Sequence, residues 1–321
     1  DHRDLHSFPT RRSSDLMTQA LIPLYCLTGF VGSGKTTVLL SILKQYPQKK
    51  IGVIFTEPAA YIKESDDISI ECLESGSLKC TCEEEALPQA LTYMRQCQPE
   101  MVFVEISGLS DPIHIKKILE KEENANALRR YDIQGIICLV DADNFMEQIQ
   151  SVEMVKHQLS HCNMAVINKA DLVSPELLSA LQANIRRINP DCEIASCSFG
   201  GFNLVLLEHE MQSVAAEEEE CTKDAPTPDS IVLSCTHRLE KQKVIQFIEH
   251  FVPDTYRIKG FCLFETGWNQ IDVVGSHINF TPCMPHSSSR LIFISKIGHA
   301  LSDALSEYWD QVFDLPMQLH D

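Results

Sequence analysis

Short apolar runs alternate with amphipathic stretches through the first two thirds of the chain. The apolar runs have the length of buried strands and occupy residues 21–28, 50–55, 100–106, 133–142 and 162–169. The stretches 36–46, 84–96 and 174–188 space their apolar residues as one face of a helix does. Ser174 followed by Pro175 is typical of a helix start. This alternation predicts an α/β fold in which a mostly parallel sheet is covered by helices on both faces.

The pattern changes after about residue 210. An acidic run and two prolines occupy residues 211–229, which we interpret as a solvated linker. From residue 230 a strand, a helix at 239–251, several strands and a last helix at 298–309 predict a small α+β domain. The chain therefore divides into a leader at 1–16, a first domain at 17–210, the linker at 211–229 and a C-terminal domain at 230–321.

The N-terminal segment has neither a strand nor a helix period. Residues 1–16 have no apolar stretch of the kind found in secretory signals, so we interpret them as an extraneous or disordered leader and expect Met17 to be the native start. No apolar run approaches the roughly 20 residues that span a bilayer. The sequence therefore predicts a cytoplasmic protein that is not embedded in a membrane.

Net charge and cysteine content narrow the class of protein further. The formal net charge of -18 argues against a protein that coats nucleic acid or an anionic membrane, because both need excess Lys and Arg. The thirteen cysteines are an odd number and fall on expected strands and helices as well as in loops. They fit a reduced compartment better than a disulfide framework. Most, such as Cys26, Cys138 and Cys262, lie in apolar runs and are expected to pack as small core residues.

A glycine-rich segment, Gly-Phe-Val-Gly-Ser-Gly-Lys-Thr at 29–36, joins the first expected strand to the first expected helix. Such a loop turns backbone N–H groups toward phosphate oxygens at a helix N-terminus. Lys35 can reach the β- and γ-phosphates and the Thr36 hydroxyl can bind Mg²⁺. The predicted phosphate-binding residues are Gly29, Gly32, Ser33, Gly34, Lys35, Thr36 and Thr37. The first domain is thus predicted to be a P-loop NTPase domain that binds a purine nucleoside triphosphate with Mg²⁺.

Two further motifs extend this site. Asn168-Lys169-Ala170-Asp171 ends a buried strand, where α/β sheets hold ligands, and has the form that recognises guanine. The Asp171 carboxylate can accept from guanine N1–H and the 2-amino group, which adenine does not offer, while the Lys169 stem packs along the base. The run ending at Glu105 supplies a carboxylate that can hold Mg²⁺ or position water, and Gly108 can donate its N–H to the γ-phosphate. We therefore expect GTP hydrolysis with Lys35, Glu105 and Gly108 as catalytic residues.

These motifs together resemble the CobW/HypB/UreG family of GTPases, most closely its CobW-like branch. The resemblance is carried by GFVGSGKTT at 29–37, VEISGLSDP at 104–112 and NKADL at 168–172, with weaker similarity at 188–194, 198–201 and 256–261. It implies slow GTP hydrolysis coupled to delivery of a transition metal, usually zinc, cobalt or nickel, to a client metalloprotein. It also implies that Glu57 lies near Mg²⁺ with Thr36 and Glu105. A nucleotide-dependent homodimer is left open.

The family places a Cys-x-Cys-Cys metal motif between the P-loop and the strand that ends at Glu105. Here the segment is Cys80-Thr81-Cys82-Glu83, so Glu83 replaces the third thiolate. Two thiolates suit Zn²⁺ or another soft ion but do not close a tetrahedral site, and Glu83 or Cys72 could supply a third ligand. The spacing alone favours two incidental thiols on a short loop, whereas the resemblance favours a metal site with Zn²⁺ ahead of Co²⁺ and Ni²⁺.

Two other functions remain open. At 56–59 this chain has Thr-Glu-Pro-Ala where the family it resembles has Asn-Glu-Phe-Gly, and at 80–83 it lacks the third thiolate. These differences are compatible with a metal-sensing or metal-binding module in which GTP is only structural. An ATP-using P-loop protein is disfavoured by the guanine motif at 168–171. The scattered histidines and cysteines of the C-terminal domain have no metal-ligand spacing, so we expect that domain to contact a client or partner.

Overall fold

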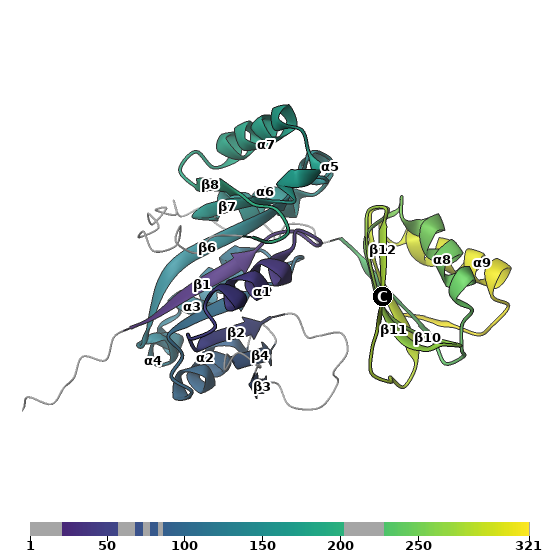
Figure 1. Cartoon of the computed structure of the whole chain (residues 1–321), viewed down its shortest axis with the longest axis horizontal. Coiled ribbons are helices and arrows are strands. Elements are labelled where there is room, and N and C mark those ends of the chain that lie inside the picture. The colour runs from purple at the N-terminus through teal and green to yellow at the C-terminus, as the bar shows by residue number, and fades with distance from the viewer. Residues whose placement is uncertain (1–20, 57–67, 73–77, 83–85, 202–227, 321) are drawn as a thin grey trace, which may run out of the picture.

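The computed structural model describes residues 21–56, 68–72, 78–82, 86–201 and 228–320, with 68–72 and 78–82 described by their backbone. It contains two domains, each built on its own sheet (Figure 1). No helix in the described part of the chain combines the length and the apolarity that crossing a bilayer requires.

The first domain contains an eight-stranded sheet in the order β3-β4-β2-β5-β1-β6-β7-β8. Its strands are β1 (Ile22–Thr28), β2 (Ile51–Phe55), β3 (Ile68–Cys72), β4 (Leu78–Cys82), β5 (Met101–Glu105), β6 (Tyr131–Asp141), β7 (Met164–Asn168) and β8 (Glu193–Ser196). All neighbours pair in parallel except β3, which runs antiparallel to β4. The central strands are buried on both faces, which explains their nearly continuous apolar runs.

Helices cover both faces of this sheet. They are α1 (Lys35–Gln45), α2 (Leu87–Gln96), α3 (Pro112–Glu120), α4 (Ala125–Leu128), α5 (Phe145–Ser151), α6 (Glu153–Ser160) and α7 (Pro175–Ile188), with short 3-10 turns η2 (Glu122–Asn124) and η3 (Ala170–Leu172). Helix α1 packs on one face of the sheet, whereas residues of α2, α3, α5, α6 and α7 belong to the core on the other face. Ser174 caps α7 by accepting from the Leu177 N–H, as its sequence predicts.

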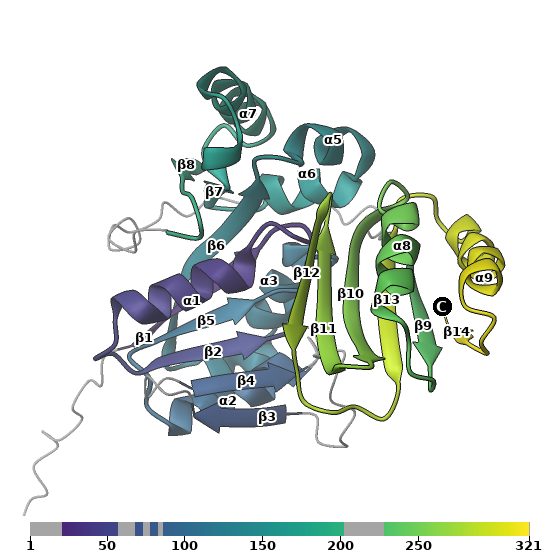
Figure 2. The ribbon, with the colours of Figure 1, turned by 45° about the vertical axis from the view of Figure 1, so that its right-hand side comes forward.

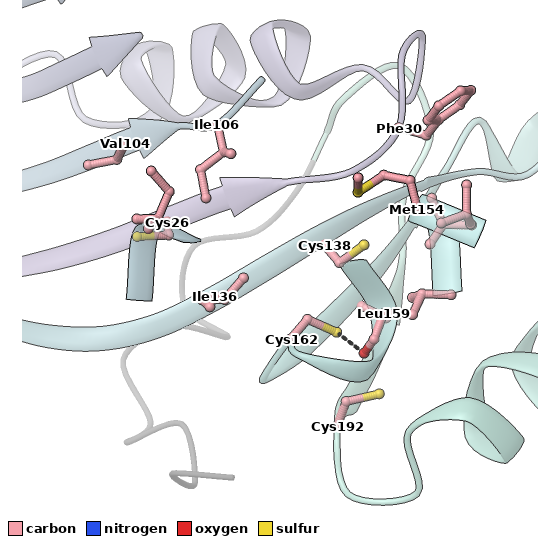
Figure 3. Close-up of a cluster of buried hydrophobic side chains, with 14 of the residues drawn as sticks. Cys26, Phe30, Val104, Ile106, Ile136, Cys138, Met154, Leu159, Cys162 and Cys192 are labelled. Atoms are coloured by element: carbon pink, nitrogen blue, oxygen red, sulfur yellow. Dashed lines mark hydrogen bonds between the residues drawn. The ribbon is translucent and has the colours of Figure 1, made fainter. Parts of the chain in front are cut away.

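The described cysteines of the first domain are mostly core residues (Figure 3). Cys138, Cys162 and Cys192 come from β6, the segment after α6 and the segment before β8, and they gather in one apolar cluster. The Cys162 thiol donates to the Leu159 carbonyl at 3.2 Å. The neighbouring thiol of Cys162 and burial raise the pKa of Cys192. The Cys138 thiol and burial raise the pKa of Cys162, so both groups stay protonated at neutral pH. The expectation that these thiols serve as packing groups is consistent with this arrangement.

The C-terminal domain is a six-stranded antiparallel sheet with two helices on one face. Its strands follow the order β12-β11-β10-β13-β9-β14. The elements are β9 (Ser230–Cys235), α8 (Lys241–Phe251), β10 (Thr255–Phe264), β11 (Gly267–Val274), β12 (His277–Pro282), β13 (Ser289–Ser295), α9 (Ala300–Val312) and β14 (Gln318–His320). Helices α8 and α9 bury Phe247, Phe251 and Trp309 against the sheet. The other face of the sheet is directed toward the first domain (Figure 1).

The two domains touch beside the P-loop (Figure 2). The rings of Phe30 and Tyr256 pack edge to face with centroids 5.2 Å apart. Lys296 donates to Glu147 at 2.5 Å, and its ammonium lies 5.5 Å from the centre of the Tyr256 ring. Ile294 of β13 joins the core of the first domain. Apolar and charged contacts thus hold the C-terminal sheet against the loop that is predicted to bind phosphate.

The predicted fold class is confirmed, including the α+β character of the second domain. One local expectation is wrong: Cys80 and Cys82 lie on strand β4, paired with β2 and β3, and not on a loop. The five residues at 78–82 have no clear alternation of apolar and polar side chains, so the strand could not be recognised from the sequence alone. The leader at 1–16 and residues 211–227 of the linker lie outside the described residues, so the domain boundaries stay predictions.

Candidate nucleotide-binding site

The P-loop connects the carboxyl end of β1 to the first turn of α1. Its backbone is possible only with glycine at two tight positions. Gly34 has φ +94°, and a methyl group there would lie 2.3 Å from the Asn168 side-chain nitrogen. Gly29 has φ +129° and would collide with the Leu139 carbonyl at 2.2 Å. The predicted glycines are therefore required by the close approach of β6 and β7 to the loop.

Two side chains of the loop present donors toward its centre. Lys35 is buried and its ammonium donates to the Gly29 carbonyl at 2.8 Å, so the side chain curls back over the loop. The Ser33 hydroxyl is also buried, and it has no hydrogen-bond partner among the described residues. A buried hydroxyl without a partner is costly, and a phosphate oxygen would satisfy it.

Glu105 lies beside Thr36, although 69 residues separate them in the sequence. Strand β5 pairs in parallel with β1, which brings Glu105 opposite Leu27 and one loop away from the helix start. The Thr36 hydroxyl donates to Glu105 Oε1 at 2.9 Å. A hydroxyl and a carboxylate side by side are hard oxygen donors of the kind that Mg²⁺ prefers. The two residues therefore fit the predicted magnesium site; Glu57 lies outside the described residues.

The turn after β5 lies directly over the P-loop. A methyl group on Gly108 would be 3.0 Å from the Lys35 ammonium and 3.0 Å from the Val31 backbone nitrogen. Helix α6 holds this turn in place, because the Gln158 side-chain amide donates to the carbonyls of Gly108 and Ser110, both at 3.2 Å. Sequence reasoning missed Gln158, which looks like an ordinary polar position on an amphipathic helix.

Asn168 links the base-recognition motif to the P-loop. Its side-chain nitrogen donates to the Ser33 carbonyl at 3.0 Å, and its oxygen accepts from the Gly200 N–H at 3.2 Å. A methyl group on Gly200 would come within 2.9 Å of Thr37, so the 198–201 segment also packs on the first turn of α1. The amide of Asn168 thus joins the end of β7 to the P-loop and to the 198–201 segment.

Lys169 and Asp171 project from the same strand end. Lys169 has the left-handed φ of +61° and its ammonium is 2.7 Å from Asp141 Oδ2. Asp141 is buried at the end of β6 and accepts also from Asn144, so it fixes the Lys169 stem. Sequence reasoning missed this role of Asp141. Burial raises the pKa of the neighbouring Cys197 to about 11, and the Asp171 charge adds to the increase.

These residues share one cavity of about 660 Å³. From the first domain it is lined by Gly32, Gly34, Lys35, Thr36, Thr37, Glu105, Asn168, Lys169, Asp171, Leu172, Phe199 and Gly200. Phe199 is 84% exposed and Leu172 is 48% exposed, so they form an open apolar rim next to Asp171. The opposite wall comes from strands β10, β11 and β12 of the C-terminal domain. That second wall was not predicted from the sequence.

The predicted metal ligands are only partly described. Cys72 is the last residue of β3, and Cys80 and Cys82 lie two residues apart on β4. Glu83 lies outside the described residues. Among the side chains that the structure describes, His, Cys, Asp and Glu form no group of three that could hold a metal ion.

The fold and the loop define a P-loop nucleotide-binding protein with a second, antiparallel domain. The model of the CobW/HypB/UreG nucleotide-binding domain matches residues 23–196, which is more than half of the chain. The chain belongs to the CobW/HypB/UreG family, in agreement with the resemblance carried by its motifs.

Relatives with assigned functions share about a quarter of their aligned residues with this chain. "Zinc-regulated GTPase metalloprotein activator 1" of Schizosaccharomyces pombe is 25% identical over 198 residues, covering 56% of this chain and 46% of that protein. "Zinc chaperone YjiA" of Escherichia coli is 28% identical over 196 residues, covering 58% of this chain and 60% of that protein. The chain spans about half the length of the curated relatives it matches.

A solved structure supports the two-domain fold. The crystal structure of Zn(II)-bound YjiA GTPase from E. coli aligns with a TM-score of 0.50 at 22% identity. The alignment covers 92% of this chain and 99% of that one. At this identity the similarity concerns the fold, including the antiparallel C-terminal domain.

Proposed function

We propose that the protein binds GTP with Mg²⁺, hydrolyses it, and couples its nucleotide state to the binding and delivery of zinc to a client metalloprotein. The observation that carries the proposal is the shared cavity. It brings the P-loop, Glu105 and the Asn168–Asp171 motif together from three parallel strands, at the carboxyl edge of the sheet. Nucleotides bind at this edge in α/β folds.

The chemistry follows from charge and position. Hydrolysis forms a bond from water oxygen to the γ-phosphorus and breaks the bond to the bridging oxygen, whose electron pair leaves with GDP. The Lys35 ammonium and the loop N–H groups lie where negative charge increases, and Thr36 and Glu105 would hold Mg²⁺, which neutralises further phosphate charge. Gly108, against Lys35 and Val31, is placed to donate its N–H to the γ-phosphate and to lose that contact after hydrolysis.

Coupling to a metal has a short path through the sheet. Thr81, between Cys80 and Cys82, pairs with Phe55 of β2, and Phe55 pairs with Glu105 of β5. The thiol pair is therefore two strands away from the carboxylate assigned to Mg²⁺. Thiolates bind Zn²⁺ well, and zinc appears in the names of the matched relatives. Cobalt and nickel are weaker candidates, and Cys72 or Glu83 would complete the ligand set.

The direct test of hydrolysis is steady-state GTP turnover by the full chain with Mg²⁺. Lys35→Ala is expected to reduce turnover at least a hundredfold, because the ammonium assigned to the β- and γ-phosphates is lost. Lys44→Ala, at an exposed position on the same helix, serves as the matched control and should leave turnover unchanged. Equal turnover by wild type and Lys35→Ala would rule out hydrolysis at this site.

Base recognition has its own test. Asp171→Asn exchanges an acceptor for an amide, so GTP affinity should fall at least tenfold while XTP affinity rises. Competition of GTP, XTP and ATP against a fluorescent GDP analogue measures this, with exposed Asp191→Asn as the control. Stronger competition by ATP than by GTP in the wild type would instead identify an ATP-using protein.

A further inference from the structure

The face of the C-terminal sheet that borders the cavity is charged. Along β10 the residues Arg257 and Lys259 line the cavity, and Asp272 of β11 lies beside both. Lys259 pairs with Asp272, which in turn pairs with Asn279 of β12. The opposite face of these strands is apolar and packs on α8 and α9. The polar face is thus a continuous surface that covers the nucleotide cavity from the second domain.

Arg257 sits between two contacts with the P-loop. Its neighbour Tyr256 packs edge to face on Phe30. On the adjacent strand, Val274 is so close to Gly32 that a methyl group on Gly32 would lie 2.8 Å from the Val274 Cγ1 atom. Phe30 and Gly32 both belong to the loop assigned to the phosphates. The backbone of β10 and β11 is therefore anchored to this loop on either side of Arg257.

The guanidinium of Arg257 is fixed in place. Its Nε and one terminal nitrogen donate to the two carboxylate oxygens of Asp272 at 2.9 and 3.0 Å. This fork of two parallel hydrogen bonds leaves a planar cation of fixed orientation at the cavity. A planar guanidinium is well suited to bind phosphate oxygens. The chain carries a formal charge of -18, so a cationic group here is not a consequence of a generally basic surface.

An ion pair that merely joins β10 to β11 is the simpler explanation of Arg257. Such a pair is partly exposed and would contribute little to stability. It does not account for the position of Arg257 in the same cavity as Lys35 and Thr36, next to two anchors on the P-loop. A phosphate-binding role accounts for the fork, the cavity and the anchors together.

We propose that Arg257, oriented by Asp272, contacts the phosphates of the nucleotide held by the P-loop and stabilises charge during γ-phosphate transfer. This inference rests on the proposed GTP hydrolysis. As water bonds to the γ-phosphorus and the bridging oxygen departs with its electron pair, charge on the departing GDP oxygens increases, and the guanidinium neutralises it. The C-terminal domain would then complete the catalytic site and respond to loss of the γ-phosphate.

The experiment measures GTP turnover and formation of the GDP–aluminium fluoride complex, which mimics the transferring phosphoryl group, in the full chain. Arg257→Ala is expected to reduce turnover at least tenfold and to abolish the aluminium fluoride complex, while GDP affinity stays within threefold of wild type. Arg257→Lys keeps a cation but loses the fork, and should recover only part of the turnover. Arg238→Ala, at an exposed position before α8, is the matched control and should behave as wild type.

Circular dichroism separates a folding defect from a catalytic one. If Arg257→Ala fails to fold, Arg257→Lys decides: a folded variant without the aluminium fluoride complex supports the proposal. Turnover that depends on Lys35 but is unchanged in both Arg257 variants overturns it and leaves the proposed function standing. If wild type does not turn over GTP, the proposed function fails, and affinity for a non-hydrolysable GTP analogue then decides the phosphate contact. A tenfold loss in Arg257→Ala supports the contact, and no loss overturns it.

Discussion

At the scale of single residues, Asn168 connects the most parts of the site. Its amide is buried and bonds to the P-loop through Ser33 and to the 198–201 segment through Gly200. Asn168 therefore positions the predicted base-recognition motif relative to the P-loop.

Replacing Asn168 by Ala should weaken both the fold and the site. The variant leaves the buried Ser33 carbonyl and Gly200 N–H without this partner, which costs about 1–3 kcal/mol. Urea unfolding should show that loss, and GTP affinity should fall at least tenfold because the loops are no longer aligned. Asn184→Ala is the control, since the partly exposed Asn184 amide donates to the Ala180 carbonyl within α7 and contacts the Met146 sulfur, and Asn184 does not line the cavity. Unchanged GTP affinity in Asn168→Ala would contradict the positioning role.

At the scale of elements, helix α6 holds the turn after β5 that lies over the P-loop. Gln158 reaches from this helix to the carbonyls of the Gly108–Ser110 turn. The preceding residue, His157, bonds to Asp111, which caps α3 by accepting from the Ile113 N–H. The turn that is assigned to sense the γ-phosphate is therefore held at both ends by neighbouring helices.

Gln158→Ala should release this turn without disturbing the P-loop. We expect GTP turnover to fall five- to twentyfold, because the Gly108 N–H is no longer fixed toward the γ-phosphate, while GDP affinity stays within twofold. The measurement is single-turnover hydrolysis together with GDP titration. Gln246→Ala, on α8 of the other domain, is a control of the same residue type. A matching loss of GDP affinity would show that the change extends beyond the turn.

Strand β1 carries a titratable core residue. Burial raises the pKa of Cys26 from 9.0 to about 12. Because the folded state holds this proton more tightly than the unfolded state, its stabilising contribution is complete below pH 9 and is lost as the pH rises toward 12. The free energy of unfolding should therefore fall less between pH 9 and 11 in Cys26→Ala than in wild type. Cys97→Ala, at a partly exposed site, should follow wild type; an equal fall in all three proteins would refute the assignment.

The elements show how far sequence reasoning reaches. Local patterns sufficed for the five central strands β1, β2, β5, β6 and β7 and for helices α1, α2 and α7, but not for β4. They also sufficed for the P-loop glycines and for the adjacency of Thr36 and Glu105, since parallel strands end at one edge. Contacts between residues far apart in the sequence could not be predicted from these local patterns. Asp141 and Gln158 act through Lys169 and Gly108, which are 28 and 50 residues away, and neither has a motif that marks its role.

At the scale of the whole molecule, the C-terminal sheet forms the second wall of the nucleotide cavity. The weaker family similarity at 256–261 falls on strand β10, but the spacing of residues in this segment did not indicate that the strand faces the P-loop. Packing between domains depends on surface complementarity, which no single segment encodes. The interface includes the Phe30–Tyr256 ring contact and the Lys296–Glu147 ion pair. A change in the P-loop can therefore alter the packing of the second domain.

Tyr256→Ala should loosen this interface. The edge-to-face pair contributes about 0.5–1.5 kcal/mol beyond its buried area, and Lys296 also packs near the lost ring. Scanning calorimetry should resolve two unfolding transitions in the variant where the wild type shows stronger coupling. Tyr93→Ala, at a half-exposed position on α2, is the control. Identical traces for wild type and Tyr256→Ala would show that the domains are not coupled through this contact.

The proposed function requires that nucleotide state controls zinc binding at the Cys80–Cys82 pair of β4. The most direct test is the zinc affinity of the full chain, measured by competition with a chromogenic chelator, once with a non-hydrolysable GTP analogue and once with GDP. We expect wild type to bind zinc at least tenfold more tightly in one nucleotide state, and Cys80→Ser/Cys82→Ser to lose both the binding and the difference. Cys97→Ser is the matched control and should retain both. Equal affinity in the two nucleotide states, or a nucleotide-dependent difference that survives in Cys80→Ser/Cys82→Ser, would contradict the claim.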